Sequence, residues 1–347
     1  MRILLVCPSW GRQCGIAHYT RHLQGGLEAL GVASDVATDP GSIRWLTAEK
    51  KYDGVLLQHE YGLYYFNLLG ILSSLEKSGI PQVITMHNTD HGGWMGAQHL
   101  FLFQTRAKLV VHSREAKDNL LKSVPPPAQS SLRVIPMGCP VYREWDVSPT
   151  QVRSELGLPV DLFTVGFFGF AAAHKGIPNL VRALFSLPEV SGYIQASTHP
   201  VNPGAVDELY RKLGLLRRSP ERSTHGNVVL SHRIVPDERL GYYQRAVDLI
   251  VLPYSQHGTS VSTSMQVCDS LASRRPVMTS TAVYFSGLDQ EVWKVAQTTP
   301  EAIAEGIETL RGNPTLCQTL VERATAYADE NAWPRVAQAY LNLLAEG

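Results

Sequence analysis

Residues 163–184 read FTVGFFGFAAAHKGIPNLVRAL, and this stretch indicates the class of fold. Its first part, 163–169, is an apolar run that ends in glycine, which is typical of a buried strand. From Lys175 onward the apolar residues recur at helical spacing, so a helix is predicted over 175–186. A near-continuous apolar strand followed by a helix favours a parallel sheet covered on both faces, and hence an α/β fold.

The same strand–helix unit recurs from one end of the chain to the other. The other predicted strands are RILLVC (2–7), GVLLQ (54–58), QVITM (82–86), KLVVHS (108–113), YIQAS (193–197), NVVLS (227–231) and DLIVLP (248–253). Helices are predicted between them, for example over 17–30, 93–106, 114–123, 236–246 and 262–273. Ligands of such sheets bind beyond the carboxyl ends of the strands, so we expect the chemistry in the loops that follow the strands.

The alternation lapses over 124–160, which is rich in proline and serine, so a domain boundary is predicted there. The composition agrees with about two domains, because the chain has 347 residues of which 44% are hydrophobic. Lysine plus arginine and aspartate plus glutamate number 31 each, which disfavours a nucleic-acid partner without excluding one. No apolar run approaches the roughly 20 residues of a transmembrane segment.

The cysteines argue for a reducing compartment. The chain has five of them, an odd number, and they are scattered without a CxxC pair. We therefore expect reduced thiols in a cytoplasmic protein, and neither a zinc site nor a disulfide framework.

Loops of the first half carry glycine, histidine and acidic residues after the predicted strands. Gly15 leads straight into a helix whose N–H groups suit a phosphate or a substrate oxygen, although a plain turn is the commoner use. The loops LQHEYG (57–62) and TMHNTDHGGW (85–94) contribute the candidates His59, Glu60, His87, Asp90 and His91. Their spacing matches neither HExxH nor a close Asp-x-Asp pair, so we predict a polar binding surface rather than a metal site. Trp94 is a candidate stacking surface, though such residues are more often core.

Loops of the second half carry cations and hydroxyl groups. Lys175 stands at a predicted helix start, where a cation opposes the helix dipole unless an anion is bound, so it is a candidate phosphate ligand. Arg233 follows another strand and has a fork that suits phosphate, although an ordinary surface arginine is commoner. The run GTSVSTS (258–264) precedes a helical pattern, and its hydroxyls either cap that helix or hold an anion there. One diphosphate held by all three would account for them together.

The order of the motifs resembles that of the GT-B glycosyltransferases of family 4, the group 1 type. After the glycine-containing first loop come LQHEYG, TMHNT, VIPMGCP (134–140), GFFGFAAAHKGI, DERLGYYQRAVDLIVLPY (237–254), GTSVSTS and SLASRRPV (270–277). The likeness spans nearly the whole chain, down to YADENAWPRVAQAYLNLL (327–344), which resembles the closing helix of the family. Each piece is loose by itself, and their common order is what is specific to the family.

The resemblance implies two Rossmann-like domains facing a central cleft, 1–145 for the acceptor and 146–328 for the donor. A closing helix over 329–347 would cross back to the first domain. The implied activity is retaining transfer of a sugar from a nucleotide diphosphate sugar, UDP- or GDP-linked, to an acceptor hydroxyl, with no metal or other cofactor. Lys175 would neutralise the diphosphate, Gly15 would approach it, and His87 would contact the donor sugar near the reacting carbon.

Two positions depart from the family pattern. Of two family glutamates eight residues apart, the second is Asp269 here, with a shorter reach toward ribose, and the first is Val261. The arginine that often follows the glycine at Gly169 is Phe170, which leaves Arg233 as the substitute cation. The contacts of the missing glutamate would then fall to the hydroxyl-rich run, through Gly258, Thr259, Ser260, Ser262 and Ser264.

Several alternatives stay open at this stage. The acceptor is a carbohydrate, a glycolipid or a small molecule, and helix 17–30 is too weakly basic to make peripheral membrane attachment the main expectation. Another GT-B enzyme, such as a nucleotide-sugar epimerase or a sugar-phosphate enzyme, would use similar phosphate loops. A non-catalytic nucleotide- or sugar-binding protein is the rival from a different class, and the loss of the first glutamate favours it.

Overall fold

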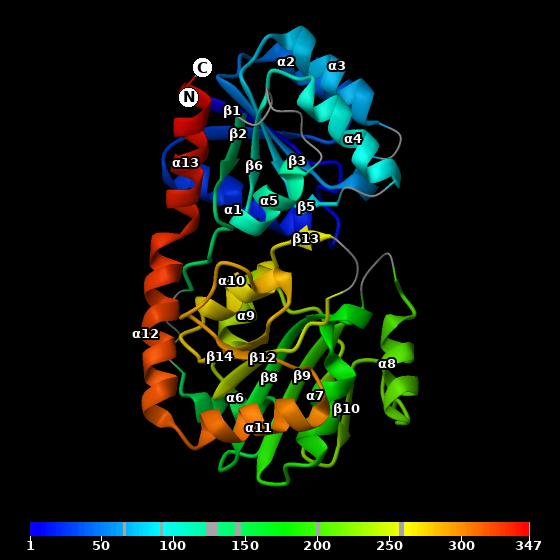
Figure 1. Ribbon diagram of the computed structural model, residues 1–347, viewed down its shortest axis with the longest axis vertical. Helices are drawn as coiled ribbons and strands as arrows, with labels where there is room; N and C mark the ends of the chain where they lie inside the picture. Colours follow the sequence, from blue (N-terminus) through cyan, green and yellow to red (C-terminus); the bar gives the residue numbers. More distant parts are fainter. Residues whose placement is uncertain are drawn as a thin grey trace. The chain divides into compact units, whose positions relative to one another are not determined.

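The structure is a computed structural model that describes residues 1–64, 67–90, 93–122, 131–142, 147–198, 202–256 and 260–346, with 93–97 described by their backbone alone. The chain divides into two compact units. Unit 1 comprises Met1–Gly138, Gly258–Met265 and Asn331–Gly347, and unit 2 comprises Cys139–His257 and Gln266–Glu330. Each unit is built around its own large β-sheet (Figure 1).

Unit 1 holds a six-stranded sheet in the order β2-β1-β3-β4-β6-β7, and every pair in it is parallel. Its strands are β1 (Arg2–Val6), β2 (Ala33–Ala37), β3 (Gly54–His59), β4 (Gln82–Met86), β6 (Lys108–Val111) and β7 (Leu132–Val134). Successive residues of a strand point to opposite faces, and all of β3 is buried, so both faces of the sheet are covered there. A separate ribbon pairs β5 (Asn88–Thr89) with β13 (Val261–Ser262).

The helices of unit 1 include one from the far end of the sequence. They are α1 (Gly15–Ala29), α2 (Pro40–Glu49), α3 (Leu68–Ser78), α4 (Gly93–Phe103), α5 (Arg114–Leu121) and α13 (Trp333–Ala345). The last helix, α13, packs against α1 (Figure 1). Tyr340 on α13 shares hydrogen bonds of 2.9 Å with the hydroxyls of Tyr19 and Thr85. The expected return of the closing helix to the first domain is confirmed.

Unit 2 holds a seven-stranded sheet in the order β10-β11-β9-β8-β12-β14-β15. Only the β10–β11 pair is antiparallel. The strands are β8 (Phe163–Phe170), β9 (Val190–Ser197), β10 (Arg222–His225), β11 (Val228–Ser231), β12 (Leu249–Leu252), β14 (Val277–Ser280) and β15 (Trp293–Val295). The predicted parallel α/β architecture is thereby confirmed. The strands without a counterpart among the predicted ones are β2, β5, β7, β10, β13, β14 and β15.

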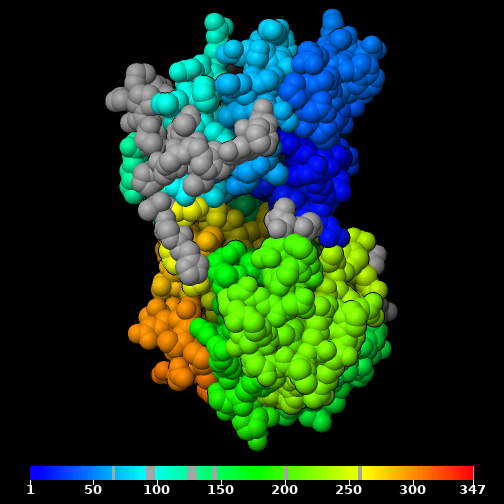
Figure 2. Space-filling view, turned by 90° about the vertical axis from the view of Figure 1, so that its right-hand side faces the viewer, coloured from blue at the N-terminus to red at the C-terminus, as the bar shows by residue number. Residues whose placement is uncertain are grey.

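The helices of unit 2 are α6 (Pro149–Glu155), α7 (Ile177–Phe185), α8 (Ala205–Leu213), α9 (Asp237–Gln244), α10 (Met265–Leu271), α11 (Pro300–Arg311) and α12 (Pro314–Glu330). Figure 2 shows the light-green region around α8 at the surface of this unit. There Glu208 pairs with Lys212 at 3.1 Å, one helical turn away. No helix in the described part of the chain is long and apolar enough to cross a membrane.

The unit boundaries differ from the predicted divisions at 145/146 and 328/329, and one further segment changes unit; near the C-terminus the shift is only two residues, to Glu330 and Asn331. The first unit ends at Gly138, where a Cβ atom would lie 2.5 Å from the indole ring of Trp333, so this glycine packs directly under α13. The segment Gly258–Met265 belongs to unit 1, whereas we expected it inside the donor domain 146–328. The reason is the antiparallel pairing of β13 with β5, a contact far apart in sequence.

Two adjacent glycines of α1 provide a test of the α1–α13 contact. A Cβ at Gly26 would lie 2.6 Å from the carbonyl oxygen of Trp333, whereas a Cβ at Gly25 would meet nothing within 4 Å. We expect Gly26→Ala to lower the free energy of unfolding by about 1–3 kcal/mol through overpacking. Gly25→Ala should raise it by up to about 1 kcal/mol through helix propensity. Urea unfolding of both variants checks this, and equal effects would contradict the packing of α13 on α1.

Candidate functional site

Lys175 lies on a tight turn between β8 and α7 in unit 2. The 3₁₀ turn Ala173–Lys175 is followed by Gly176, whose φ of 68° lies in the left-handed region. A Cβ atom at Gly176 would lie 2.0 Å from the carbonyl oxygen of Pro253, so only glycine lets the turn pass this close to the end of β12. The turn therefore holds Lys175 beside the loop that follows β12.

The side chain of Tyr254 contacts the ammonium group of Lys175. Lys175 Nζ donates a hydrogen bond of 2.6 Å to Tyr254 Oη and lies 4.2 Å from the centroid of the ring. Tyr254 itself is 1% exposed, packs on Phe285 with ring centroids 4.9 Å apart, and accepts a hydrogen bond from Ser280 Oγ at its carbonyl. Among the described residues, no carboxylate lies within ion-pair distance of Lys175. The lysine is thus positioned without a described counterion.

Arg233, the other predicted phosphate ligand, has a counterion. Its Nε and Nη2 both donate to one carboxylate oxygen of Glu221, and this bond raises the pKa of Arg233 above its ordinary value. The Arg233 side chain is 69% exposed. Gln195 ties its backbone to the predicted Gly169, because it accepts from Gly169 N–H at 2.9 Å and donates to the Arg233 carbonyl at 2.8 Å. The side chain of Gln195 therefore bridges the backbones of Gly169 and Arg233, while the charge of the Arg233 side chain is already paired with Glu221.

Asp269 lies in α10 and is buried, at 5% exposure. Burial, and after it the charge of Asp269, raises the pKa of the Tyr142 hydroxyl well above its usual range. Val261, which aligns with the first of the two family glutamates, is also buried, and its backbone belongs to β13. This position therefore offers an apolar side chain and no carboxylate.

His87 follows β4 in unit 1 and is part of a chain of buried hydrogen bonds. Its Nε2 lies 3.0 Å from Gln58 Oε1, and its Nδ1 lies 3.2 Å from Nε2 of His112. Nδ1 of His112 lies 3.0 Å from the carbonyl oxygen of Ile135. Burial lowers the pKa of His87 well below its usual range and that of His112 to about 4. Both imidazoles are therefore neutral at pH 7.

The described part of the hydroxyl-rich run is tied to the residues just after His87. Ser260 Oγ donates to Asn88 Oδ1 at 2.5 Å, and Thr89 Oγ1 donates to the carbonyl of Val261 at 3.3 Å. Ser262 is the last residue of β13, and Ser264 directly precedes α10. Residues of this run thus stabilise the pairing of β13 with β5, besides preceding a helix. The sequence had indicated helix capping and anion binding as uses of the run, but not this strand pairing.

His59 and Glu60 differ from the expectation that they point toward a ligand. His59 is 0% exposed, hydrogen-bonds Gln98 Oε1 through Nε2 at 2.9 Å, and stacks on Tyr64 with ring centroids 5.2 Å apart. Burial lowers the pKa of His59 to about 4. The carboxylate of Glu60 accepts from Gly62 N–H at 2.9 Å, and burial raises its pKa. His59 is therefore a core residue, and Glu60 caps the short turn that follows β3.

The remaining candidates of the first half are only partly described. The backbone of Asp90 exchanges hydrogen bonds with the Tyr61 hydroxyl, at 2.9 Å and 3.0 Å. His91, Gly258 and Thr259 lie outside the described residues, as does the side chain of Trp94.

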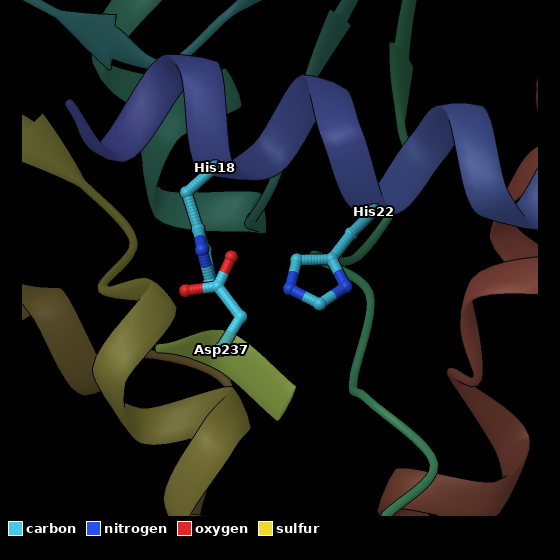
Figure 3. Close-up of side chains that lie close together, drawn as sticks. All are labelled: His18, His22 and Asp237. Carbon is cyan, nitrogen blue, oxygen red and sulfur yellow. The ribbon is translucent and has the colours of Figure 1, made fainter. Parts of the chain in front are cut away.

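Gly15 begins α1, and the N-cap residue Cys14 makes no side-chain hydrogen bond to the first turn. A Cβ atom at Gly15 would meet nothing within 4 Å, so the space beside it is open in unit 1. One turn further, His18 and His22 project from the same face of α1 with ring centroids 4.4 Å apart (Figure 3). Beyond the helix start that we predicted, this end of α1 therefore carries a pair of imidazoles.

Three residues of these networks were missed from the sequence. His112, Gln195 and Tyr254 each lie at or just beyond the end of a strand. A polar or tyrosine side chain at the carboxyl end of an apolar strand was the available signal, and we had not applied it to these three positions.

Comparisons with known proteins identify the fold. No protein-family model matches the chain, and no curated protein matches its sequence. Among solved structures, HepE of Anabaena in complex with UDP and glucose is similar over 100% of both chains, with a TM-score of 0.79 and 16% identity. Sucrose-phosphate synthase of Thermosynechococcus elongatus matches over 100% of both chains, with a TM-score of 0.77 and 16% identity. A glycosyltransferase of Rickettsia africae matches over 99% of this chain and 98% of its own, with a TM-score of 0.75 and 14% identity. The chain thus has the GT-B fold of these proteins.

The burial of His59 predicts a pH dependence of stability. Its pKa is about 4 in the folded protein and 6.5 in the unfolded chain, so the unfolded chain binds more protons between these values. This contribution is complete above pH 6.5 and is lost as the pH falls toward 4. From pH 7 to pH 5 we expect His59 to lower the free energy of unfolding by about 2 kcal/mol.

Urea unfolding of the wild type and of His59→Gln at both pH values measures this contribution. The variant should lose less stability than the wild type on acidification, by the same amount of about 2 kcal/mol. Parallel losses in the two proteins would show that His59 titrates normally and is not buried.

Proposed function

We propose that the chain is a glycosyltransferase of the family 4 type, which moves a sugar from a nucleotide diphosphate sugar to an acceptor hydroxyl with retention and without a metal. The observation that carries this proposal is Lys175, a cation positioned by Tyr254 at the carboxyl end of a parallel sheet with no described counterion. The GT-B fold supports it, since HepE of Anabaena was solved with UDP-glucose and with UDP. UDP is for this reason the first donor nucleotide to try, with GDP second.

The chemistry that Lys175 would perform is charge neutralisation. As the bond to the sugar breaks, negative charge develops on the departing diphosphate, and a cation already aimed at it lowers the barrier. The hydrogen bond to Tyr254 pre-orients the ammonium group, so little reorganisation is needed during the reaction. Arg233 is the second cation proposed for the diphosphate, and it would have to exchange Glu221 for the ligand.

The other roles follow the family positions. Asp269 would accept hydrogen bonds from the ribose hydroxyls of the donor, and the N–H groups before α10 would receive the phosphates. Gly15 would bring backbone N–H groups of α1 to an anion, which fits the open space at its Cα. His87 would contact the sugar as a neutral imidazole. The acceptor class stays among carbohydrates, glycolipids and small molecules.

A thermal-shift panel of UDP, GDP, ADP, CDP and dTDP, each with and without EDTA, tests the donor. A ligand at about 100 times its dissociation constant adds about 2.7 kcal/mol to the free energy of unfolding. We expect selective stabilisation by one nucleotide, with UDP favoured, and no change on adding EDTA. Loss of the shift in EDTA would contradict metal independence. Absence of any shift would contradict the nucleotide diphosphate donor and favour a sugar-phosphate enzyme.

Variants of the two cations test the role of Lys175. We expect Lys175→Ala to lower turnover about 10²- to 10³-fold, the usual cost of removing one group that stabilises developing charge. Arg233→Ala is the comparison variant: Arg233 is also proposed for the diphosphate, but its charge is already paired with Glu221, so its loss should cost less than that of Lys175. The turnover of both variants is measured as a single-turnover rate. The substrate is the sugar-linked form of the nucleotide that gives the thermal shift. Near-normal turnover in Lys175→Ala, with its thermal midpoint retained, would refute the assignment.

The second candidate is a protein that binds a nucleotide sugar without transferring it. The observation in its favour is Val261, an apolar strand residue where the family carries its first glutamate. This candidate predicts the same nucleotide shift but no release of nucleotide diphosphate from the sugar donor, with or without acceptor. Analysis of the sugar product then separates transfer from epimerisation.

A further inference from the structure

Four neighbouring strands of unit 1 end in groups that form one hydrogen-bonded row. Gln58 lies in β3, His87 follows β4, His112 follows β6, and Ile135 follows β7. The sheet order β3-β4-β6-β7 places these groups side by side at its carboxyl edge. The three side chains are 0%, 7% and 6% exposed, so water does not compete for their hydrogen bonds.

The direction of each hydrogen bond follows from the carbonyl at the end of the row. The carbonyl oxygen of Ile135 can only accept, so His112 must carry a hydrogen on Nδ1. A neutral imidazole has one N–H, so Nε2 of His112 then holds a lone pair. The bond of 3.2 Å to His87 therefore requires His87 to donate from its own Nδ1. His87 Nε2 is left with a lone pair.

Gln58 completes the row. Two acceptors cannot share a hydrogen bond, so the group of Gln58 that faces His87 Nε2 at 3.0 Å must be its NH₂. The oxygen and nitrogen of a side-chain amide exchange places by a simple flip. With the opposite orientation, Gln58 Nε2 would be buried without any partner. The flip turns a contact between two lone pairs into a hydrogen bond and moves the amide oxygen to the buried position that Nε2 had occupied.

We propose that His112, anchored by the Ile135 carbonyl, is a positioning residue that holds His87 in the Nδ1–H form, with an Nε2 that accepts hydrogen bonds. Packing reinforces this, because the ring of Tyr19 lies against His87 and His112, with centroids 4.5 Å and 5.2 Å away. In this form the one lone pair of His87 Nε2 accepts from the Gln58 amide, and a ligand hydroxyl, which can donate, would take the place of that amide, whereas a carboxylate or phosphate oxygen, which cannot donate, would not. The ligand part of the inference rests on the proposed function, since the hydroxyl would belong to the sugar.

Nitrogen-15 NMR of the full-length protein, labelled at histidine, tests the tautomers directly. Long-range proton–nitrogen correlations distinguish Nδ1–H from Nε2–H imidazoles, and single histidine substitutions assign the signals. We expect Nδ1–H for both His87 and His112 at pH 7. An Nε2–H form of either residue, or a doubly protonated ring, would overturn the proposal. This readout needs neither substrate nor turnover.

Two variants of His112 test the coupling to His87. The His112→Gln side chain reaches far enough to accept from His87 Nδ1, so His87 should stay Nδ1–H and turnover should change less than about threefold. His112→Leu removes the acceptor, so we expect a signal from the Nε2–H form of His87 and a fall in kcat of about tenfold. Nucleotide affinity should be unchanged in both variants. Equal behaviour of Gln and Leu would contradict a positioning role.

The outcomes separate this inference from the proposed function. Nδ1–H tautomers in a protein that binds no nucleotide would uphold the arrangement of the row and refute the transferase. Nucleotide binding and sugar transfer in a protein whose His87 is in the Nε2–H form would uphold the transferase and refute the arrangement of the row. If His112→Leu does not fold, the tautomers of the wild type still decide the proposal.

Discussion

Parallel strand pairing is the constraint on which unit 1 depends. In a parallel sheet the carboxyl ends of neighbouring strands lie at one edge, and the loops that follow them meet there. The register in unit 1 sets Gln58 level with Thr85, and Val111 level with Val134. Polar groups that are far apart in sequence are thereby brought into one row, and burial forces every member of that row to find a hydrogen-bond partner.

The same constraint acts in unit 2 with a different result. Strands β8 and β12 are neighbours, so the loop that carries Lys175 passes the loop that carries Tyr254. The closeness of this passage depends on Gly176, because any side chain there would collide with the carbonyl of Pro253. A cation placed by a hydroxyl rather than by a carboxylate keeps its charge available for an anionic ligand. Arg233 differs from Lys175, because the carboxylate of Glu221 already neutralises its charge.

The contribution of α13 to unit 1 is packing across a long sequence separation. Trp333 fills the space above Gly138 and Gly26, where no Cβ atom would fit. The Tyr340 hydroxyl joins α1 to β4 through Tyr19 and Thr85. Tyr19 also packs on His87, so α13 supports the row of hydrogen bonds indirectly, through its contact with Tyr19. Removal of α13 would therefore disturb the candidate site as well as the core.

The sequence by itself determined the α/β class, the positions of most strands, and the loops in which His87 and Lys175 lie, because apolar periodicity and strand ends are local properties. It did not determine whether a polar residue at a strand end faces outward or inward. His59 and His87 look alike in sequence, yet only the neighbours that each meets in the fold decide that His59 bonds Gln98 and His87 bonds His112. The place of Ser260 beside Asn88, and the ion pair of Arg233 with Glu221, are likewise contacts between segments. Such contacts depend on how the chain returns on itself, and local pattern holds no information about that.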